Sequence, residues 1–533
     1  MTLPYSSPRV LCEDWFCAAD KPTLKGSCCP ACKARYFPPR QVCPGCGTEP
    51  LVNYDLPAAG HVLASTIVRV APAPWQAPYP VAAVQLTDGL VVYAHLVGEH
   101  IVAGTPVTLE ALPVARADGE ALIYGFRPTT EVAAEIEISG ISSEAISEDV
   151  PGIRPLVAPV FLAGVGMIPF GKYSGIPAEM LALRASYAAL QDAGLAPREI
   201  EAIFVGTAFG GTAMGQKLLR HAPWGQRPVV NVENACASGS TALLEAAAWV
   251  ASGRCDVALA VGVDTPASQG GGLISLPPDD PLAAVGITLP ALYALTADSY
   301  LQASGTTPRD LALTVVASRR HAAANPYAYL RTPVTVEEVL QSRLIADPLT
   351  LFQCCPNADG AAAAIVVSAA YARRIGATIR LRAAHLRSGR VQSRFSPHSV
   401  VTRAAYEAYE SAGIGPADLQ VAEIHDAYSS AIPLALEKLG LAPHYEAVAR
   451  FAQGAYEPGG AGPAVNPGGG LLSRGHPPGA TGLAQVFEIV TQLRGQAGAR
   501  QIPGAQAGLV QNQGGTVLDL ETNAVAIFIL TRS

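Results

Sequence analysis

Basic residues, charged residues in general and long apolar runs are all scarce in this chain of 533 residues. Charged residues make up only 15%, and Asp and Glu (43) outnumber Lys and Arg (36). Because a protein that binds nucleic acid needs a basic face for the phosphate backbone, the formal net charge of −7 argues against that class. A local basic pocket for a phosphorylated cofactor is still compatible with this balance.

The apolar runs are too short to cross a membrane. Val257–Val263 is one of them, and its length suits a strand, not a bilayer-spanning helix. The N-terminus has no basic stretch followed by an apolar one, so no signal peptide is indicated. Four of the 11 cysteines fall at metal-binding spacing and the others are scattered, which favours a reduced, cytoplasmic protein over a disulfide-bonded one.

Two pairs of cysteines predict a metal site, Cys29-Pro-Ala-Cys32 and Cys43-Pro-Gly-Cys46. Two such turns bring four thiolates into the tetrahedral arrangement that suits zinc. Four protein ligands leave no open position, so we expect the zinc to be structural. Cys28 could replace its neighbour Cys29, but the CxxC spacing favours Cys29.

A small β-barrel follows the cysteines. We expect an N-terminal helix and zinc ribbon in residues 1–50 and a barrel in residues 51–127. Short β-rich runs divided by Gly and Pro predict the barrel strands: His61–Val70, Val81–Leu86, Leu90–Leu96 and Val107–Leu112. An oligonucleotide-binding module is the competing interpretation, and the acidic balance and the lack of interleaved basic and aromatic residues count against it.

This N-terminal region resembles the DUF35 family, a rubredoxin-like zinc ribbon joined to an OB fold. The four cysteines, Phe37-Pro-Pro-Arg40 and the strands to about Phe126 carry the resemblance. It implies a domain that accompanies thiolase-like enzymes and that holds the acyl-CoA or stabilises the complex. Residues 128–156 are acidic and rich in Ser and Gly, which predicts a linker.

The rest of the chain is internally duplicated. Asp192-Ala-Gly-Leu-Ala-Pro-Arg-Glu-Ile200 has a counterpart in Ser411-Ala-Gly-Ile-Gly-Pro-Ala-Asp-Leu419. An alanine-rich helix precedes each copy, at 178–193 and 401–412, and a short apolar strand follows each, at 202–205 and 421–424. We therefore predict two related α/β halves, 157–375 and 376–533.

Cys236 is the candidate nucleophile. Small residues surround it in the run Val232–Ala242, and an alanine-rich helix, Ala242–Ala251, follows. That arrangement would place the sulfur at a helix N-terminus, where the dipole stabilises a thiolate that can attack a thioester. The competing interpretation is a small buried hydrophobic residue, as for most lone cysteines.

Two histidines are candidate partners. His425 directly follows the second-half strand, at the carboxyl end where ligands gather in open α/β sheets. His476 lies in the glycine-rich stretch Asn466–Gly482, before an expected helix at Leu483–Leu493. Glycines let backbone approach a ligand closely, so we expect contacts to the cofactor from this stretch and from the C-terminal glycines. The predicted cofactor contacts are Asn466, Gly469, Gly479 and Gly514.

Residues 160–533 resemble the thiolase superfamily, in its sterol-carrier-protein-type and archaeal-type branch. The motifs that carry the resemblance are Gly164–Gly171, Asn234-Ala-Cys-Ala-Ser-Gly-Ser240, Cys354–Ala363, His425-Asp-Ala-Tyr428, Gly475-His-Pro-Pro-Gly-Ala-Thr-Gly482 and Asn512-Gln-Gly-Gly515. The resemblance implies a duplicated five-layer α-β-α-β-α fold, a homodimer and acyl-CoA substrates. It also implies roles for Cys236 as the acyl-carrying nucleophile, His476 as its base and His425 as an oxyanion donor. The backbone N–H groups of Cys236 and of Gly514 or Gly515 are candidates for a second oxyanion hole.

One expected group is missing. Thiolases carry a second cysteine that moves the proton on the substrate α-carbon, and here its two possible places hold Gln511-Asn512 and Ala427. Neither an amide nor a methyl group is a base at neutral pH. Tyr428 or Cys355 could replace it, the acceptor could be an activated aromatic ring or a decarboxylating thioester, or the scaffold could catalyse retro-aldol cleavage of a β-hydroxyacyl-CoA.

We therefore predict an acyl-CoA C-acyltransferase that makes or cleaves a carbon–carbon bond β to a thioester. The alternatives are the retro-aldol lyase and C-acylation of an aromatic acceptor. An additional thiolase-like or HMG-CoA-synthase-like subunit is a possible partner.

Overall fold

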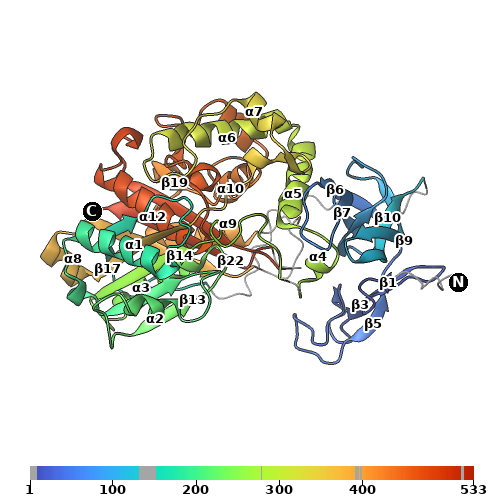
Figure 1. Ribbon diagram of the computed structural model, residues 1–533, viewed down its shortest axis with the longest axis horizontal. Coiled ribbons are helices and arrows are strands. Elements are labelled where there is room, and N and C mark those ends of the chain that lie inside the picture. Colours follow the sequence, from blue (N-terminus) through green and yellow to red (C-terminus); the bar gives the residue numbers. More distant parts are fainter. Residues whose placement is uncertain (1–8, 131–151, 278, 390–394, 396–398, 518–520) are drawn as a thin grey trace.

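The computed structural model describes residues 9–130, 152–277, 279–389, 395, 399–517 and 521–533. A small β-rich part, residues 9–128, lies beside a larger α/β part, residues 160–533 (Figure 1). We call the first the ribbon–barrel part and the second the duplicated domain. Most of the linker predicted at 128–156 falls outside the described residues, which leave out 131–151.

The ribbon–barrel part consists of strands. Its ribbon holds β2 (Phe16–Cys17), β3 (Thr23–Cys28), β4 (Arg35–Tyr36) and β5 (Val52–Asp55). Its barrel holds β6 (Ala59–Val68), β7 (Tyr79–Leu86), β8 (Val91–Leu96), β9 (Pro106–Arg116) and β10 (Gly119–Pro128), close to the predicted runs.

The helix expected within residues 1–50 is not found in residues 9–50, the part of that range that the structure describes. Among the described residues of 1–50, the first element is β1 (Arg9–Val10), which pairs in parallel with β10. The backbone N–H of Leu11 continues this pairing by donating to Leu122 O at 2.7 Å. Pairing with an open barrel edge therefore decides the local structure here, because a short segment gains more from a ready hydrogen-bonding partner than from an isolated helical turn.

The duplicated domain contains two sheets of identical topology. The first has the order β13 (Val229–Val232), β12 (Ala202–Gly206), β14 (Val257–Asp264), β17 (Gly360–Ser368), β11 (Val160–Met167). The second has the order β20 (Ala464–Val465), β19 (Val421–Glu423), β21 (Ala507–Gly514), β22 (Ala524–Arg532), β18 (Ile379–Arg387). In both sheets the first three strands pair in parallel, and the fourth strand pairs antiparallel with both of its neighbours. Pairing of β11 with β18 joins the two sheets.

Three layers of helices enclose the sheets, which confirms the predicted five-layer fold (Figure 1). Helices α1 (Ala178–Ala193), α2 (Met214–Leu219) and α8 (Ala369–Ile375) cover the first sheet. Helices α9 (Val400–Ala412), α10 (Ala431–Lys438) and α11 (Ala447–Ala452) cover the second. The inner layer consists of α3 (Ser238–Ala251) and α12 (Pro478–Arg494), packed together between the sheets.

The internal duplication is present in detail. Helices α1 and α9 both end at a glycine with positive φ, Gly194 at 67° and Gly413 at 66°. A short 3₁₀ turn follows in each half, Pro197–Glu199 and Pro416–Asp418, and then a parallel strand. The C-cap glycine and the proline in the turn are the sequence signals that made this repeat visible.

An insertion between β14 and β17 connects the two parts. It contains α4 (Pro281–Ala284), α5 (Leu289–Ser304), α6 (Pro308–Ala323), α7 (Val336–Gln341), β15 (Leu344–Ala346) and β16 (Leu349–Thr350). Helices α4 and α5 lie against the barrel (Figure 1). Strand β15 pairs with β6 through Ala346 and Val68, so the insertion extends the barrel sheet.

Buried aromatic residues seal this contact. Trp75, Tyr79 and His95 stack with ring centroids 5.1–5.7 Å apart, and each such pair contributes about 0.5–1.5 kcal/mol. The hydroxyl of Tyr79 donates to Gly286 O at 2.6 Å, and His95 Nε2 lies 3.0 Å from Val285 O. The barrel core and the buried face of α5 are therefore one continuous apolar cluster.

Candidate active site

Cys236 lies just before α3, which begins at Ser238 and so starts earlier than the expected Ala242. The preceding residue, Ala235, has a positive φ of 47°, which turns the chain sharply ahead of the cysteine. Ser238 fixes this turn, because its hydroxyl accepts from Asn234 N at 2.9 Å and donates to Ala235 O at 2.6 Å. The small residues around Cys236 therefore serve a tight turn that presents the sulfur.

His476 is hydrogen-bonded to Cys236, with 3.1 Å between Nε2 and Sγ. Its other nitrogen, Nδ1, lies 2.8 Å from Thr481 Oγ1. Because the Thr481 hydroxyl donates to Pro477 O at 2.9 Å, its oxygen accepts from Nδ1–H. This assigns the proton to Nδ1 and leaves Nε2 free to accept the thiol proton of Cys236.

The Cys236–His476 pair is neutral at rest. Burial raises the pKa of Cys236 to about 12, although the N–H groups of Gly515 and of Cys236 itself act in the opposite direction. Burial also lowers the pKa of His476 to about 3. The expectation of a thiolate stabilised by the helix N-terminus is thus corrected, because desolvation outweighs the helix end. The neutral Nε2 of His476 is therefore an acceptor in place for the thiol proton of Cys236.

His425 follows β19 and lies beside His476, with ring centroids 5.3 Å apart at 84°. The side-chain nitrogen of Asn512 donates to His425 Nδ1 at 3.0 Å, so the ring carries its proton on Nε2. Gln511 accepts from the His425 backbone N–H at 2.8 Å. Burial lowers the pKa of His425 well below its usual value, which keeps the ring a neutral donor. Gln511 and Asn512, at one place of the missing second cysteine, thus orient His425.

The three side chains converge on one point, since the sulfur and a ring nitrogen of each histidine lie within 4.8 Å of one another. Such a trio has the composition of a metal site, but its hydrogen bonds are those of a nucleophile, a base and a donor. The N–H groups of Cys236 and Gly515 lie toward the sulfur and can form a second oxyanion hole.

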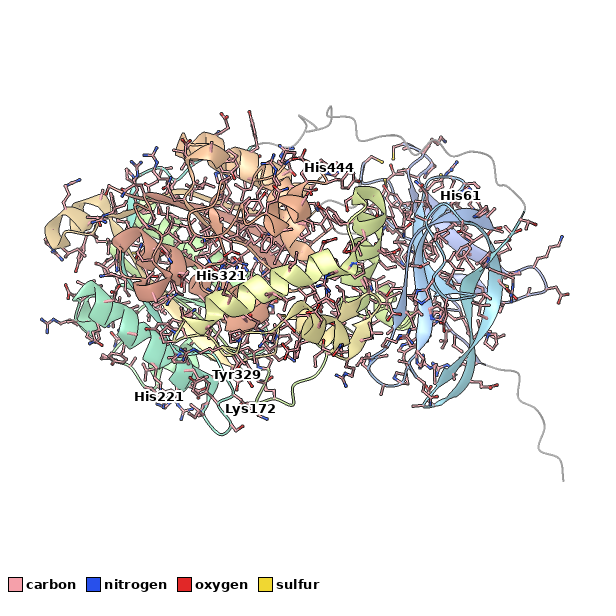
Figure 2. All side chains as sticks on the ribbon, turned by 90° about the horizontal axis from the view of Figure 1, so that it is seen from above. His61, Lys172, His221, His321, Tyr329 and His444 are labelled. Carbon is pink, nitrogen blue, oxygen red and sulfur yellow. The ribbon has the colours of Figure 1, made fainter. Side chains whose placement is uncertain are left out.

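A cavity of about 760 Å³ opens onto this trio. Leu276, Tyr293 and Ile345 of the insertion form part of its wall, and Val70 reaches it from the barrel. Its charged wall residues are Lys172, Glu233 and Arg343. Lys172 and Tyr329, which both line the cavity, are labelled near one edge of the molecule in Figure 2. The cavity is therefore apolar inside with a mixed-charge mouth, a composition suited to a thioester with a charged remote end.

The four predicted cofactor contacts are not among the residues that line the cavity. Asn466 uses its side chain on Ile424, accepting from N at 2.8 Å. Gly469 packs against Ala322 of α6, where a Cβ would lie 2.6 Å from that side chain. Gly479 belongs to α12, and its N–H donates to Asp264 at 2.6 Å. Gly514 packs against Asn234 O. These residues permit close packing behind Cys236 and His476, and their geometry gives no support to direct contact with a ligand.

Sequence reasoning missed the residues that orient the site. Thr481 and Asn512 set the two histidine tautomers, and Asp264 anchors the N-terminus of α12. The only sequence signal for Thr481 was that it lies five residues after His476 in the glycine-rich motif. The sequence marked Asn512 as part of the Asn512–Gly515 motif and as a place where a thiol is absent, but it gave no sign of its contact with His425.

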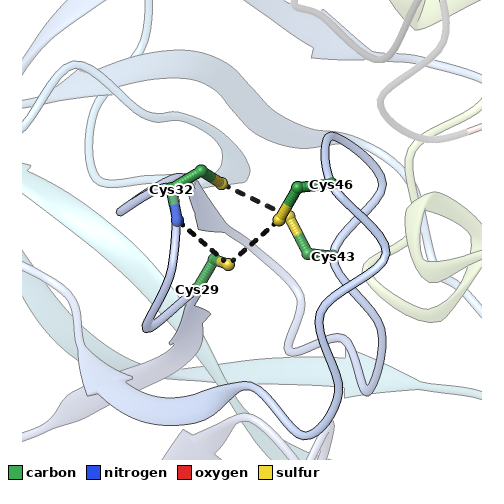
Figure 3. Close-up of side chains that lie close together, drawn as sticks. All are labelled: Cys29, Cys32, Cys43 and Cys46. Carbon is green, nitrogen blue, oxygen red and sulfur yellow. Dashed lines mark hydrogen bonds between the residues drawn. The ribbon is translucent and has the colours of Figure 1, made fainter.

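The predicted zinc ligands form a compact cluster (Figure 3). The sulfur atoms of Cys29 and Cys46, and those of Cys32 and Cys43, lie 3.5 Å apart. Tetrahedral Zn–S bonds of about 2.3 Å place sulfurs about 3.8 Å apart, so the four thiols fit the ion. Cys28 points elsewhere, toward the carbonyls of Cys29 and Lys33, which agrees with the predicted spacing.

Family models match both parts of the chain. The thiolase N-terminal domain matches residues 160–370 and the thiolase C-terminal domain-like family matches 386–529. The chain belongs to the thiolase family. Its N-terminal part matches the rubredoxin-like zinc ribbon domain of ChsH2 at 18–52 and the C-terminal OB-fold domain of ChsH2 at 54–111.

Similar proteins agree with this family. The benzoylsuccinyl-CoA thiolase subunit BbsB of Thauera aromatica is 36% identical over 64% of this chain and 91% of its own length. The acetyl-CoA acetyltransferase of Methanothermobacter thermautotrophicus is 36% identical over 67% of this chain and 96% of its own. A solved Ltp2-ChsH2(DUF35) aldolase aligns with a TM-score of 0.61 at 26% identity, over 70% of this chain and 98% of that one.

This thiolase-like protein is an acyltransferase that acts on acyl-CoA, which confirms the main function predicted from the sequence. Within the part of the chain that the structure describes, no helix is both long and apolar enough to cross a membrane.

Proposed function

We propose that this protein is an acyl-CoA C-acyltransferase that works through a covalent acyl-enzyme on Cys236. The observation that carries the proposal is the 3.1 Å contact between Cys236 Sγ and the unprotonated Nε2 of His476. A thiol aimed at a base whose far nitrogen is held by Thr481 is the arrangement that nucleophilic catalysis requires.

In the first half-reaction His476 takes the thiol proton as the sulfur attacks the acyl carbonyl. Negative charge builds on the thioester oxygen, where Nε2–H of His425 and the N–H groups of Cys236 and Gly515 can donate. In the second half-reaction a new nucleophile attacks the acyl-Cys236 carbonyl. The sulfur leaves and takes its proton back from His476, which gives ping-pong kinetics.

Lys172 and Arg343 at the cavity mouth are the proposed partners of the CoA phosphates. Arg343 directly precedes β15, the strand that pairs with the barrel, so the barrel fixes the backbone beside this guanidinium. The ribbon–barrel part therefore supports the CoA end of the site without supplying a reacting group.

The finer partners are also proposals. The donor set of Cys29, Cys32, Cys43 and Cys46 suits a structural zinc ion, which would hold the ribbon turns together. Strand β13 ends the first sheet with one open edge among the described strands, and it is the proposed contact of a homodimer. A cytoplasmic location and an additional thiolase-like or HMG-CoA-synthase-like subunit stay predictions.

Retro-aldol cleavage is the second candidate, because neither Ala427 nor Asn512 offers a thiol at the α-carbon. The aligned Ltp2-ChsH2(DUF35) structure is named an aldolase, and its name includes ChsH2, whose domain models match the N-terminal part of this chain. The two functions differ in their products, since a lyase releases an aldehyde or ketone and consumes no CoA.

The deciding experiment weighs the protein after incubation with a panel of acyl-CoA thioesters. We expect one acyl group to be added at Cys236, no addition in Cys236→Ala, and normal addition in the control Cys255→Ala, whose thiol is buried away from the cavity. Unimpaired turnover by Cys236→Ala, with a carbonyl product, would establish the lyase instead.

A further inference from the structure

One proton of the proposed reaction has no assigned carrier. Breaking or making the bond between the α- and β-carbons requires a group that gives or takes a proton at the α-carbon. Ala427 lines the cavity with a methyl group, and the amide of Asn512 is engaged with His425 and Ser240. His476 already serves Cys236, so the group must come from elsewhere in the wall.

Cys355 lies directly opposite one place of the missing cysteine. Its backbone N–H donates to Ala427 O at 2.9 Å, and the neighbouring residue Cys354 forms an antiparallel bridge with Tyr428. The segment before β17 therefore runs alongside Ala427 and Tyr428. This pairing brings the thiol of Cys355, from the first half of the domain, next to Ala427 in the cavity wall, where a thiol is missing.

The surroundings of the Cys355 thiol fit a proton carrier. Cys355 lines the same cavity as Cys236, His425 and His476. Burial is the main cause that raises its pKa well above the usual value, and ionisation of a nearby acidic group such as Asp426 acts in the same direction. Such a thiol stays protonated until a much stronger base, an enolate, forms beside it.

The adjacent thiol is engaged differently. Cys354 Sγ donates to Thr350 O at 3.4 Å, whereas the Cys355 thiol forms no hydrogen bond with the described residues. Tyr428 is stacked on Tyr293 with ring centroids 4.2 Å apart, which holds its ring as a wall. Of these three candidates, Cys355 has the least constrained acidic group.

We propose that Cys355 is the catalytic acid and base at the substrate α-carbon, replacing the second thiol of other thiolases. The inference rests on the proposed C-acyl transfer. In the cleavage direction the Cys236 thiolate attacks the β-keto carbon and the bond to the α-carbon breaks. Its electron pair passes to the α-carbon, which takes the proton of Cys355 Sγ–H.

The second half-reaction restores this proton. The Cys355 thiolate takes the proton of the incoming CoA thiol, and the CoA thiolate attacks the acyl-Cys236 carbonyl. Cys236 leaves as a thiolate and recovers its own proton from His476. Both cysteines end as thiols, so the cycle balances without an oxidant or another reactant. In the condensation direction the same thiolate removes the α-proton.

The test separates acylation from α-proton transfer. Wild type, Cys355→Ala, Cys355→Ser, Cys354→Ala and Tyr428→Phe are incubated with acetyl-CoA and propionyl-CoA. Intact mass reports acylation of Cys236, and NMR in D₂O reports exchange of the α-protons. We expect both Cys355 variants to acylate normally and to lose exchange and turnover by about 10²–10⁴-fold. Cys354→Ala and Tyr428→Phe should stay within about tenfold of wild type.

Any other outcome contradicts either the role of Cys355 or the proposed function. Exchange at the wild-type rate in Cys355→Ala, or its loss in Tyr428→Phe alone, overturns the role of Cys355 while acylation of Cys236 stands. Loss of acylation together with exchange in both Cys355 variants makes the residue structural and also overturns the role. If wild type itself acquires no acyl group, the proposed function fails, and the inference fails with it.

Discussion

The two halves of the duplicated domain place matching elements around one cavity and equip them with different chemistry. Cys236 precedes the first residue of α3 by two positions, and His476 precedes the first residue of α12 by two positions. The second residues of these helices, Gly239 and Gly479, touch across the inner layer, where a Cβ on Gly239 would lie 2.3 Å from Gly479 O. Cys236 and His476, the proposed nucleophile and base, thus occupy equivalent positions of an internal repeat.

The difference between the halves shows how the repeat diverged. In the first half, β14 ends at Asp264, which accepts hydrogen bonds from Thr207 Oγ1, Ala208 N, Phe209 N and Gly479 N at 2.6–2.9 Å. In the second half, the corresponding strand β21 carries Asn512, which orients His425. In the proposed reaction the first half supplies the nucleophile Cys236 on this scaffold, and the second half supplies its base His476 and the oxyanion donor His425.

Removing the base from the second half should have the largest effect. We expect His476→Gln to slow acylation of Cys236 by about 10²–10⁴-fold, because the neutral thiol loses its proton acceptor. Stopped-flow or quench-flow mass measurement of the acyl-enzyme checks this. Wild-type acylation rates in His476→Gln would show that another group activates the sulfur.

The same histidine makes stability depend on pH. The pKa of His476 falls from 6.5 in the unfolded chain to about 3 in the folded one, so the unfolded state binds its proton first as the pH drops. Its contribution to stability is present above pH 6.5 and is lost as the pH falls toward 3. Comparing the unfolding free energy of wild type and His476→Gln across this range isolates the effect.

Removing His425, or changing which of its nitrogens carries the proton, should slow the reaction somewhat less than His476→Gln does. We expect His425→Ala to lose about 10²–10³-fold in kcat, the usual loss of one oxyanion donor. Asn512→Asp should give a similar loss, because a carboxylate accepts from Nδ1 and leaves Nε2 without its proton. Ser240→Ala, which removes the other partner of Asn512, is the matched control. Equal losses in Asn512→Asp and Ser240→Ala would point to packing and not to the tautomer.

Removing Asp264, the hydrogen-bond acceptor at the end of β14, should lower the free energy of unfolding more than it lowers the rate of the reaction. Asp264→Ala leaves four donors without their acceptor in a buried site, at about 1–3 kcal/mol for each unsatisfied group. We expect a large fall in the free energy of unfolding, measured by chemical denaturation. Thr207→Val removes one of the four donors and should cause a much smaller fall, and equal effects would show that the hydrogen bonds of Asp264 do not act as an anchor.

The smallest effect on turnover should come from the zinc ribbon. Cys32→Ser should lose bound zinc and unfold the ribbon locally, while the cavity keeps its wall, to which the ribbon contributes no residue among those described. Metal analysis and kinetics test both expectations. Cys28→Ser, which alters the neighbouring thiol outside the cluster, should keep its zinc. Full zinc content in Cys32→Ser would refute the four-thiolate site.

Much of the fold was predictable because its signals are local. The repeated glycine cap and proline turn marked both halves, and the motifs around Cys236, His425 and His476 pointed to three side chains that the structure brings together. The role of Asn512 was not predictable, because its partner His425 lies 87 positions away in sequence and only the fold brings them together. The glycines around His476 were expected to contact a ligand. A glycine also lets neighbouring segments pack closely, and the sequence does not distinguish these two uses.

Strand β15 links the barrel to the wall of the substrate cavity. It belongs by sequence to the duplicated domain and by hydrogen bonding to the barrel, and its Ile345 and the adjacent Arg343 lie on the cavity wall. The carboxylate of Asp347, at the hairpin turn, binds Arg69 of the barrel at 2.7 Å. An engineer who exchanged the barrel for that of a relative would therefore also reshape the substrate pocket, so the two domains must be transplanted as one unit.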